Sequence, residues 1–207
     1  IPSMSEAQEV PHPLHAQKLQ YLKDNISKFP PSAFRAIAIG DSLRDIPRDK
    51  FTEIKPIANF GESGALHYHC KDQLVDTYSI IPVGVVQFVY IGTCIGNPLM
   101  AYQDYEYSLG KTLEVYESAR ALYPLARIIG LALPPTESVW ANLHRPLFEA
   151  ALWAWCVKDG NAVMESFQKL GTGFLGLFPK MCFSADTVHA SPEGVARLNT
   201  ADRNAQT

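Results

Sequence analysis

Residues 34–42 read Phe-Arg-Ala-Ile-Ala-Ile-Gly-Asp-Ser, and this stretch decides the fold. The short apolar run from Phe34 to Ile39 predicts a buried strand. The run ends in Gly40-Asp41-Ser42, where the glycine admits the tight backbone geometry of a strand end. We therefore expect a buried strand that presents Ser42 at its carboxyl end.

Four further segments have the pattern of buried strands: Ile54–Asn59, Val83–Ile91, Arg127–Leu133 and, more weakly, Ala162–Phe167. Between them lie segments with helical spacing, at residues 67–78, about 103–123 and 142–158, the last with Leu143, Leu147, Ala151 and Ala154 on one face. This alternation predicts an α/β fold with three α/β/α layers, a five-stranded parallel sheet and flavodoxin-like architecture. Ligands of such folds bind beyond the carboxyl ends of the strands.

A leading segment precedes this pattern. Apolar residues recur there at helical spacing before Pro30-Pro31 ends the helix, namely Leu14, Leu19, Leu22 and Ile26. We therefore divide the chain into residues 1–30, a leading segment with an N-terminal helix, and residues 31–207, the α/β domain.

Composition narrows the classes of partner and compartment. The 207 residues are 47% hydrophobic and 19% charged, and a net charge of -3 gives no electrostatic reason to expect a nucleic acid. No apolar stretch approaches the roughly 20 residues that span a bilayer. The first residues lack a signal-peptide pattern, which slightly favours the cytoplasm, although a chain that begins with Ile leaves a removed leader open.

The four cysteines lie far apart and form no Cys-x-x-Cys pair. We interpret Cys70, Cys94, Cys156 and Cys182 as ordinary buried thiols, because neither a zinc ribbon nor a disulfide framework has this spacing. No cofactor is expected.

Ser42 has two potential catalytic partners near the other end of the chain, Asp186 and His189. A serine hydroxyl becomes a nucleophile when an imidazole takes its proton and a carboxylate orients that imidazole. Alone, Ser42 would be read as a turn or helix-capping serine. The two residues between Asp186 and His189 allow one turn to present both side chains on the same side, which favours a Ser-His-Asp triad.

These blocks resemble the GDSL family of the SGNH hydrolase superfamily over residues 34 to about 198. Gly40-Asp41-Ser42-Leu43 matches the first block, Asn59-Phe60-Gly61-Glu62-Ser63-Gly64 the second, and Asp186-Thr187-Val188-His189 the last. The resemblance implies that Ser42 is the nucleophile, with Asp186 and His189 completing the triad. It also implies that the backbone N–H groups of Ser42 and Gly64 form an oxyanion hole.

The third block departs from the family. The resemblance implies Gly-x-Asn after the third strand, with the asparagine as a further oxyanion donor, but Gly92-Thr93 is followed by Cys94. Cysteine is a weak hydrogen-bond donor. Asn97, three residues later, is a second candidate for this role. Losing one oxyanion donor typically lowers the rate roughly a hundredfold to a thousandfold.

Three functions follow from this comparison. The favoured one is a serine esterase that cleaves short-chain acyl esters through an acyl-enzyme, with O-acetyl groups on carbohydrate as the leading example of a small-molecule or carbohydrate ester. The alternatives are an SGNH-type O-acyltransferase, favoured if water is excluded by the apolar Gly171–Phe178 loop, and a non-catalytic binding protein that retains the fold. Oligomeric state is not indicated.

Other patterns are weaker. His67-Tyr68-His69-Cys70 offers metal-ligating side chains, but a helix would separate His67 from His69 and no distant ligand completes a site. Gly110-Lys111-Thr112 lacks the earlier glycine of a phosphate-binding loop. Gly61-Glu62-Ser63-Gly64 is one residue short of the Gly-x-Ser-x-Gly elbow, so Ser63 is a poor rival nucleophile.

Overall fold

Five parallel strands form one sheet. The computed structural model of the protein describes residues 9–42, 57–92, 104–131 and 139–165, together with Ala196 and Ala205. The strands are β1 (Ala36–Gly40), β2 (Ile57–Asn59), β3 (Phe88–Gly92), β4 (Arg127–Leu131) and β5 (Ala162–Glu165), in the order β2-β1-β3-β4-β5. This is the flavodoxin-like strand order, in which the direction of winding reverses between β1 and β3.

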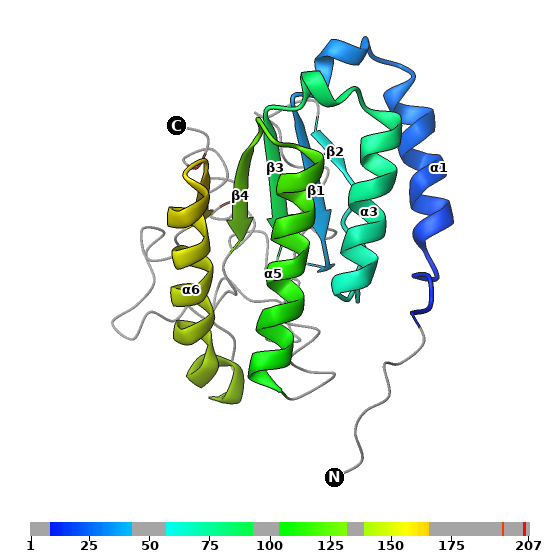
Figure 1. The fold of residues 1–207 in the computed structure, drawn as a ribbon. Coiled ribbons are helices and arrows are strands. Elements are labelled where there is room, and N and C mark those ends of the chain that lie inside the picture. Colours follow the sequence, from blue (N-terminus) through cyan, green and yellow to red (C-terminus); the bar gives the residue numbers. More distant parts are fainter. Residues whose placement is uncertain are drawn as a thin grey trace.

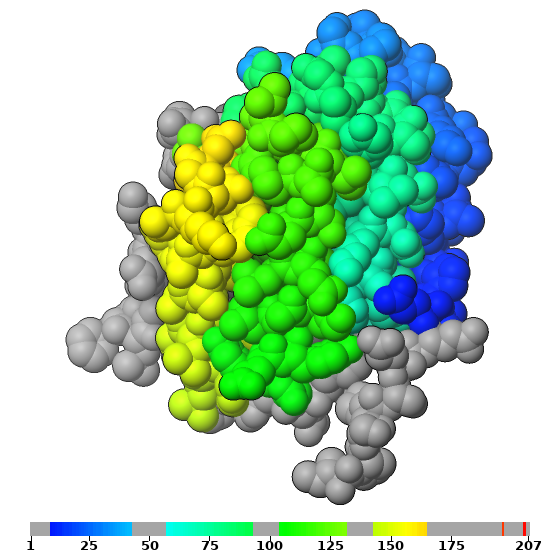
Figure 2. All heavy atoms as spheres, viewed as in Figure 1, coloured from blue at the N-terminus to red at the C-terminus, as the bar shows by residue number. Residues whose placement is uncertain are grey.

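Helices cover the sheet. They are α1 (His15–Ile26), α3 (His67–Ile80), α5 (Tyr105–Leu122) and α6 (Val139–Asp159), with short 3₁₀ turns η1 (Pro31–Ala33) and η3 (Val83–Val85). Figure 1 shows α3, α5 and α6 side by side across one face, with α1 beyond α3 at the β2 edge. The space-filling view shows these helices packed into a continuous surface (Figure 2).

Alternate residues of β1 face opposite sides of the sheet. Ile37 and Ile39 belong to the large apolar cluster beneath the helices, whereas Ala36 and Ala38 belong to a smaller cluster on the other face, where Ala205 packs. A strand buried on both faces requires apolar residues at every position, which explains the uninterrupted run in the sequence. The predicted three-layer α/β/α fold is confirmed.

The third strand is shorter than predicted. The apolar run Val83–Ile91 predicts one strand, but β3 begins at Phe88. Pro82 lacks the N–H that a strand ladder uses, and its carbonyl accepts the N–H of Val85 at 3.0 Å, which starts a 3₁₀ turn instead. Residues 54–56, 132–133 and 166–167, which complete three other predicted strands, lie outside the described residues.

The apolar face predicted for the last helix lies on the surface of α6. Leu143 is 68% exposed and Leu147 is 57% exposed, and Ala154 is also exposed. The buried stripe is formed by Phe148, Leu152 and Cys156, one turn apart. Helical spacing therefore identified the helix, while the abundance of apolar residues on two sides concealed which side enters the core.

The N-terminal helix is attached to the main core. Leu22 of α1 is buried within the same apolar cluster as Leu74 of α3, and Leu19 and Ile26 pack against that cluster. Within the described parts of the chain, no helix is both long enough and apolar enough to cross a membrane.

Two of the predicted buried thiols are described by the structure. Cys70 and Cys156 are buried, as expected, while Cys94 and Cys182 lie outside the described residues. Burial and, to a smaller extent, the nearby carboxylate of Asp159 raise the pKa of Cys156 to about 12. This thiol is therefore inert at neutral pH.

Candidate active site

Strand β1 ends at a glycine whose surroundings leave no room for a side chain. Gly40 has φ +144°, and a Cβ atom built on it would lie 2.3 Å from the carbonyl oxygen of Gly92 on β3. The ends of β1 and β3 thus approach each other at the point where strand order reverses. Asp41 follows as a buried residue and Ser42 as a half-buried one at the start of a helical turn.

Backbone groups of the loop after β2 make hydrogen bonds that hold the loop in place. Four hydrogen bonds hold it: Gly61 N–H to Asn59 Oδ1 (2.9 Å), Glu62 N–H to the Gly40 carbonyl (3.0 Å), Ala65 N–H to the Glu62 carbonyl (3.0 Å), and His12 Nε2–H to the Ser63 carbonyl (2.9 Å). The bond between Glu62 and Gly40 aligns this loop with the end of β1. The loop and Ser42 therefore lie at the same end of the sheet, beyond the carboxyl ends of β2 and β1.

Gly64 is the residue of this loop that has empty space beside it. It is exposed, it has φ +86°, and nothing lies within 4 Å of the position its Cβ would occupy. Its N–H donates no hydrogen bond to any residue that the structure describes. An exposed backbone N–H held by a rigid loop is the type of donor that an oxyanion hole uses.

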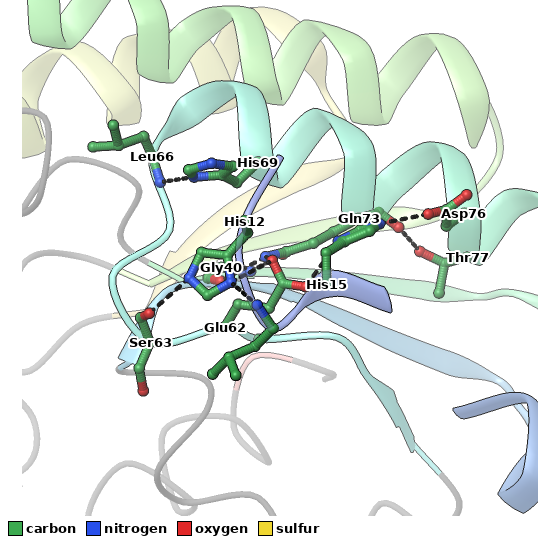
Figure 3. A network of polar contacts seen from close by, with 12 residues as sticks. His12, His15, Gly40, Glu62, Ser63, Leu66, His69, Gln73, Asp76 and Thr77 are labelled. Carbon is green, nitrogen blue, oxygen red and sulfur yellow. Dashed lines mark hydrogen bonds and ion pairs between the residues drawn. The ribbon is translucent and has the colours of Figure 1, made fainter. Parts of the chain in front are cut away.

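A buried polar network lies behind the end of β1 (Figure 3). Gln73 of α3 accepts the Gly40 N–H with Oε1 at 2.8 Å, while its Nε2 donates to the Gly40 carbonyl and to Glu62 Oε2, both at 3.1 Å. The other carboxylate oxygen of Glu62 accepts from His15 Nδ1 at 2.8 Å, and His15 Nε2 donates to Asp76 at 2.6 Å. The N-terminal helix is thereby joined to the strand that precedes Ser42.

Hydrogen bonding assigns donor and acceptor roles to the ring nitrogens of the histidines near this network. His12 and His69 each accept a backbone N–H at Nδ1, from Leu14 and Leu66 respectively, and each donates from Nε2. The 3.8 Å approach of His12 Nδ1 to Glu62 is therefore no ion pair, since that nitrogen already accepts a hydrogen bond from the Leu14 N–H.

His15 differs because both of its ring nitrogens face carboxylates. Burial works against the charged ring, but the hydrogen bond to Asp76 and the charge and hydrogen bond of Glu62 together raise the pKa of His15 above its usual value. The charged form of His15 is favoured because both of its ring nitrogens then donate to carboxylates, one of them that of Glu62, whose side chain is 1% exposed.

The structure describes part of the predicted site. Ser42 and Gly64 lie on loops at the same edge of the sheet, while Asp186, His189, Cys94, Asn97 and the Gly171–Phe178 loop lie outside the described residues. The roles of Ser42, Gly64, Asp186 and His189 stay predictions.

The polar network of Gln73, Glu62 and His15 was not anticipated from the sequence. The one signal was Glu62, a carboxylate among the small and apolar residues of the 59–64 block. A buried carboxylate requires a partner, but its partners lie 11 and 47 residues away along the chain.

The two histidines of the His67–Cys70 segment have separate surroundings. Burial, followed by the charges of Lys111 and Lys71, lowers the pKa of His67 to about 4. His69 instead donates to the Val10 carbonyl at 2.8 Å and closes the first turn of α3. Over the described ranges, no group of three or more His, Cys, Asp or Glu side chains is arranged to hold a metal ion.

Comparison with known proteins identifies the fold. No known family model matches the sequence, and no curated protein is significantly similar to it. A solved structure from Streptococcus pneumonia, proposed to be a platelet activating factor, has a TM-score of 0.73 at 16% identity and covers 92% of this chain and 91% of its own.

Two further solved structures have the same arrangement. A GDSL-like lipase from Bacteroides thetaiotaomicron has a TM-score of 0.66 at 15% identity, with 92% of this chain and 97% of its own covered. A carbohydrate esterase of family 3 from Talaromyces cellulolyticus has a TM-score of 0.61 at 14% identity, with 82% and 94% covered. The fold that the Gly40-Asp41-Ser42 block predicts is therefore confirmed: the chain has the fold of the GDSL-like lipases and SGNH hydrolases.

Proposed function

We propose that the protein is a serine esterase that cleaves short acyl esters through an acyl-enzyme on Ser42. The observation that carries this proposal is the exposed N–H of Gly64, without a partner among the described residues, on a loop that is hydrogen-bonded to the end of β1. We place this donor beside the anion that develops at Ser42, because Glu62 of the same loop is hydrogen-bonded to Gly40, two residues before Ser42. Preorganised donors of this kind contribute strongly to acyl transfer.

The proposed reaction has two halves. His189, oriented by Asp186, takes the proton of the Ser42 hydroxyl as its oxygen attacks the ester carbonyl, and the N–H groups of Ser42 and Gly64 bind the resulting oxyanion. Collapse of this intermediate transfers the proton from His189 to the departing alcohol and leaves the acyl group on Ser42. Water, activated by the same histidine, then releases the acid and restores the serine.

O-acetylated carbohydrate is the substrate class that we favour. The fold is shared with a carbohydrate esterase of family 3, although it is also shared with lipases. A net charge of -3 provides no attraction for strongly acidic substrates, which suits a neutral ester.

A fluorophosphonate probe tests the nucleophile. We expect stoichiometric labelling of the folded protein, located at Ser42 by peptide mass spectrometry and lost in Ser42→Ala. Ser63→Ala is the matched control, because Ser63 is an exposed serine on the adjacent loop and its loss should leave labelling unchanged. Absence of labelling in the wild type, or equal labelling of Ser42→Ala, would support a non-catalytic binding protein instead.

Ester series and acceptors test the substrate and the fate of the acyl group. We expect kcat/KM to be higher for p-nitrophenyl acetate than for the octanoate, and acetate to be released from acetylated sugars. Adding alcohols or sugars during turnover separates hydrolysis from transfer, since an acyltransferase would give the acylated acceptor in place of free acid. A preference for the octanoate would contradict the short-chain assignment.

A further inference from the structure

The end of β1 needs hydrogen-bond partners that the sheet does not supply. The ladder between β1 and β2 ends at the pair Ala38–Asn59, but β1 continues to Gly40. The N–H and carbonyl of Gly40 point toward the β2 side of β1, beyond the last residue that pairs with β2. The carbonyl accepts the N–H of Glu62, whereas the Gly40 N–H finds no acceptor among the described residues of the loop.

Gln73 supplies the missing acceptor, and a second donor to the carbonyl, with one side chain. Its amide accepts the Gly40 N–H at 2.8 Å and donates to the Gly40 carbonyl at 3.1 Å, as a neighbouring strand would. The side chain is fully buried, so no water competes for these groups. Gln73 thus fixes the peptide groups that immediately precede Asp41 and Ser42.

Glu62 and His15 in turn fix Gln73. Glu62 Oε2 accepts from the same amide nitrogen at 3.1 Å, which excludes the flipped amide because an oxygen there would face the carboxylate. Glu62 Oε1 is held by His15 at 2.8 Å, and the second nitrogen of His15 is anchored on Asp76. His15 also stacks on Phe60, with ring centroids 4.8 Å apart.

We propose that Gln73, Glu62 and His15 form a positioning relay that fixes the carboxyl end of β1 and so aims Ser42 at the substrate. The proposal rests on the proposed role of Ser42 as nucleophile. It makes the leading segment, which the sequence sets apart from the α/β domain, a required part of the site. The three residues touch no reacting atom; they act through the backbone of Gly40.

The relay predicts a specific kinetic defect. Gln73→Met keeps the length of the side chain but loses both hydrogen bonds to Gly40, and a small misplacement of the nucleophile lowers the rate by about tenfold to a hundredfold. We expect this loss in kcat for p-nitrophenyl acetate and in the rate of fluorophosphonate labelling, with KM within about twofold because the groups that bind substrate are unchanged.

Thr77→Val is the matched control. Thr77 is equally buried, one turn later on α3, and its hydroxyl donates to the Gln73 backbone carbonyl and not to β1. Both variants lose buried hydrogen bonds and should unfold at lower temperature. Only Gln73→Met should also react slowly at a temperature where both variants are folded, and only in it should amide hydrogens of residues 36–42 exchange faster with solvent.

A double-mutant cycle tests the outer part of the relay. His15→Gln alone leaves the buried carboxylate of Glu62 without its counter-charge, and Glu62→Gln alone leaves His15 without its charged acceptor, so each single substitution should lower kcat. Pairing His15→Gln with Glu62→Gln removes both charges while keeping donors and acceptors, and should restore kcat to within about threefold of wild type, because the two residues interact directly.

The outcomes separate this inference from the proposed function. If the wild type labels at Ser42 but Gln73→Met reacts at the wild-type rate, the relay is overturned and the esterase proposal stands. If the wild type neither labels nor hydrolyses any ester, both are overturned. Equal losses of rate in Gln73→Met and Thr77→Val would assign Gln73 a structural role alone and also overturn the relay.

Discussion

Gly40 occupies a position where two strand ends meet backbone to backbone. A methyl group there would meet the Gly92 carbonyl oxygen at 2.3 Å, and φ +144° disfavours any L side chain. We expect Gly40→Ala to lower the free energy of unfolding by about 2 to 4 kcal/mol, from steric overlap and backbone strain together. Urea denaturation followed by circular dichroism measures this change.

Gly110 provides a comparison of opposite sign. It lies within α5, and nothing lies within 4 Å of its would-be Cβ. Gly110→Ala should raise the stability by about 0.5 to 1 kcal/mol, because alanine restricts the unfolded chain and favours helix. Equal effects of the two substitutions would contradict the close approach of β1 and β3.

Arg120 joins the ends of three elements. Its guanidinium makes two hydrogen bonds of 2.7 Å to Asp159 at the end of α6, and it also donates to the carbonyls of Tyr123 and Ala126 between α5 and β4. The hydrogen bonds from Arg120 to Asp159 lower the pKa of that carboxyl despite its burial. Such a bidentate pair, with Asp159 only 7% exposed, differs from a solvated surface pair.

We expect Arg120→Leu to destabilise the protein by about 3 kcal/mol, because it leaves the buried Asp159 carboxylate without its partner. Lys158→Ala is the control: this exposed neighbour of Asp159 should change stability by less than about 0.5 kcal/mol. Arg120 precedes β4 and lies near the amino ends of the strands, whereas Ser42 follows the carboxyl end of β1. Esterase activity at a permissive temperature should therefore persist. A large loss of activity without unfolding would contradict this separation.

The two sides of α6 give a test within one turn of helix. Phe148 is 1% exposed, while the adjacent Leu147 is 57% exposed. Phe148→Ala should cost about 3 to 5 kcal/mol, and Leu147→Ala less than about 1 kcal/mol. Thermal unfolding of the two variants distinguishes this orientation from the opposite one, in which the effects would be reversed.

The helices and strands show which features of the fold can be predicted from sequence alone. The β1 strand was predictable because its apolar run is short and ends at a glycine, and α5 because its segment has helical patterning. The limit of β3 was not, because Pro82 and Gly84 favour a turn within an apolar run. The buried side of α6 was equally hidden, since Leu143 and Leu147 compete with Phe148 and Leu152 for the core.

The candidate site has the same limit. Ser42 and Gly64 follow from local motifs, whereas Gln73 has no local signal: it is a polar residue within a helix, and only the fold brings it to Gly40. Gln73 matters because the pairing of β1 with β2 ends before Gly40, and the length of that pairing is a property of the assembled sheet.

At the scale of the whole molecule, histidines set opposing limits on stability. His15 has a raised pKa, so its contribution is complete below its unfolded value of about 6.5 and is lost as pH rises through the folded value. His67, with a pKa of about 4, and His69, also lowered chiefly by burial, contribute above pH 6.5 and lose this as pH falls. Among these three groups, stability should decline on both sides of neutrality.

Urea denaturation from pH 4 to 9 measures this profile. His15→Gln should flatten the alkaline side, because glutamine keeps a donor but has no titrating proton. His67→Gln should flatten the acid side, between about pH 6.5 and 4. Profiles of the two variants that match the wild type would contradict the assigned protonation states.

The contact between Gly40 and Gly92 also has a genetic consequence. The atoms that would oppose a side chain at residue 40 are backbone atoms of Gly92, so no substitution at position 92 can make room. At Gly130, by contrast, a new Cβ would meet the Tyr116 hydroxyl and the Met164 sulfur, both side-chain atoms that a substitution at residue 116 or 164 can remove. A suppressor screen from Gly130→Ala should therefore recover second-site changes at Tyr116 or Met164, whereas one from Gly40→Ala should return mainly reversion to glycine.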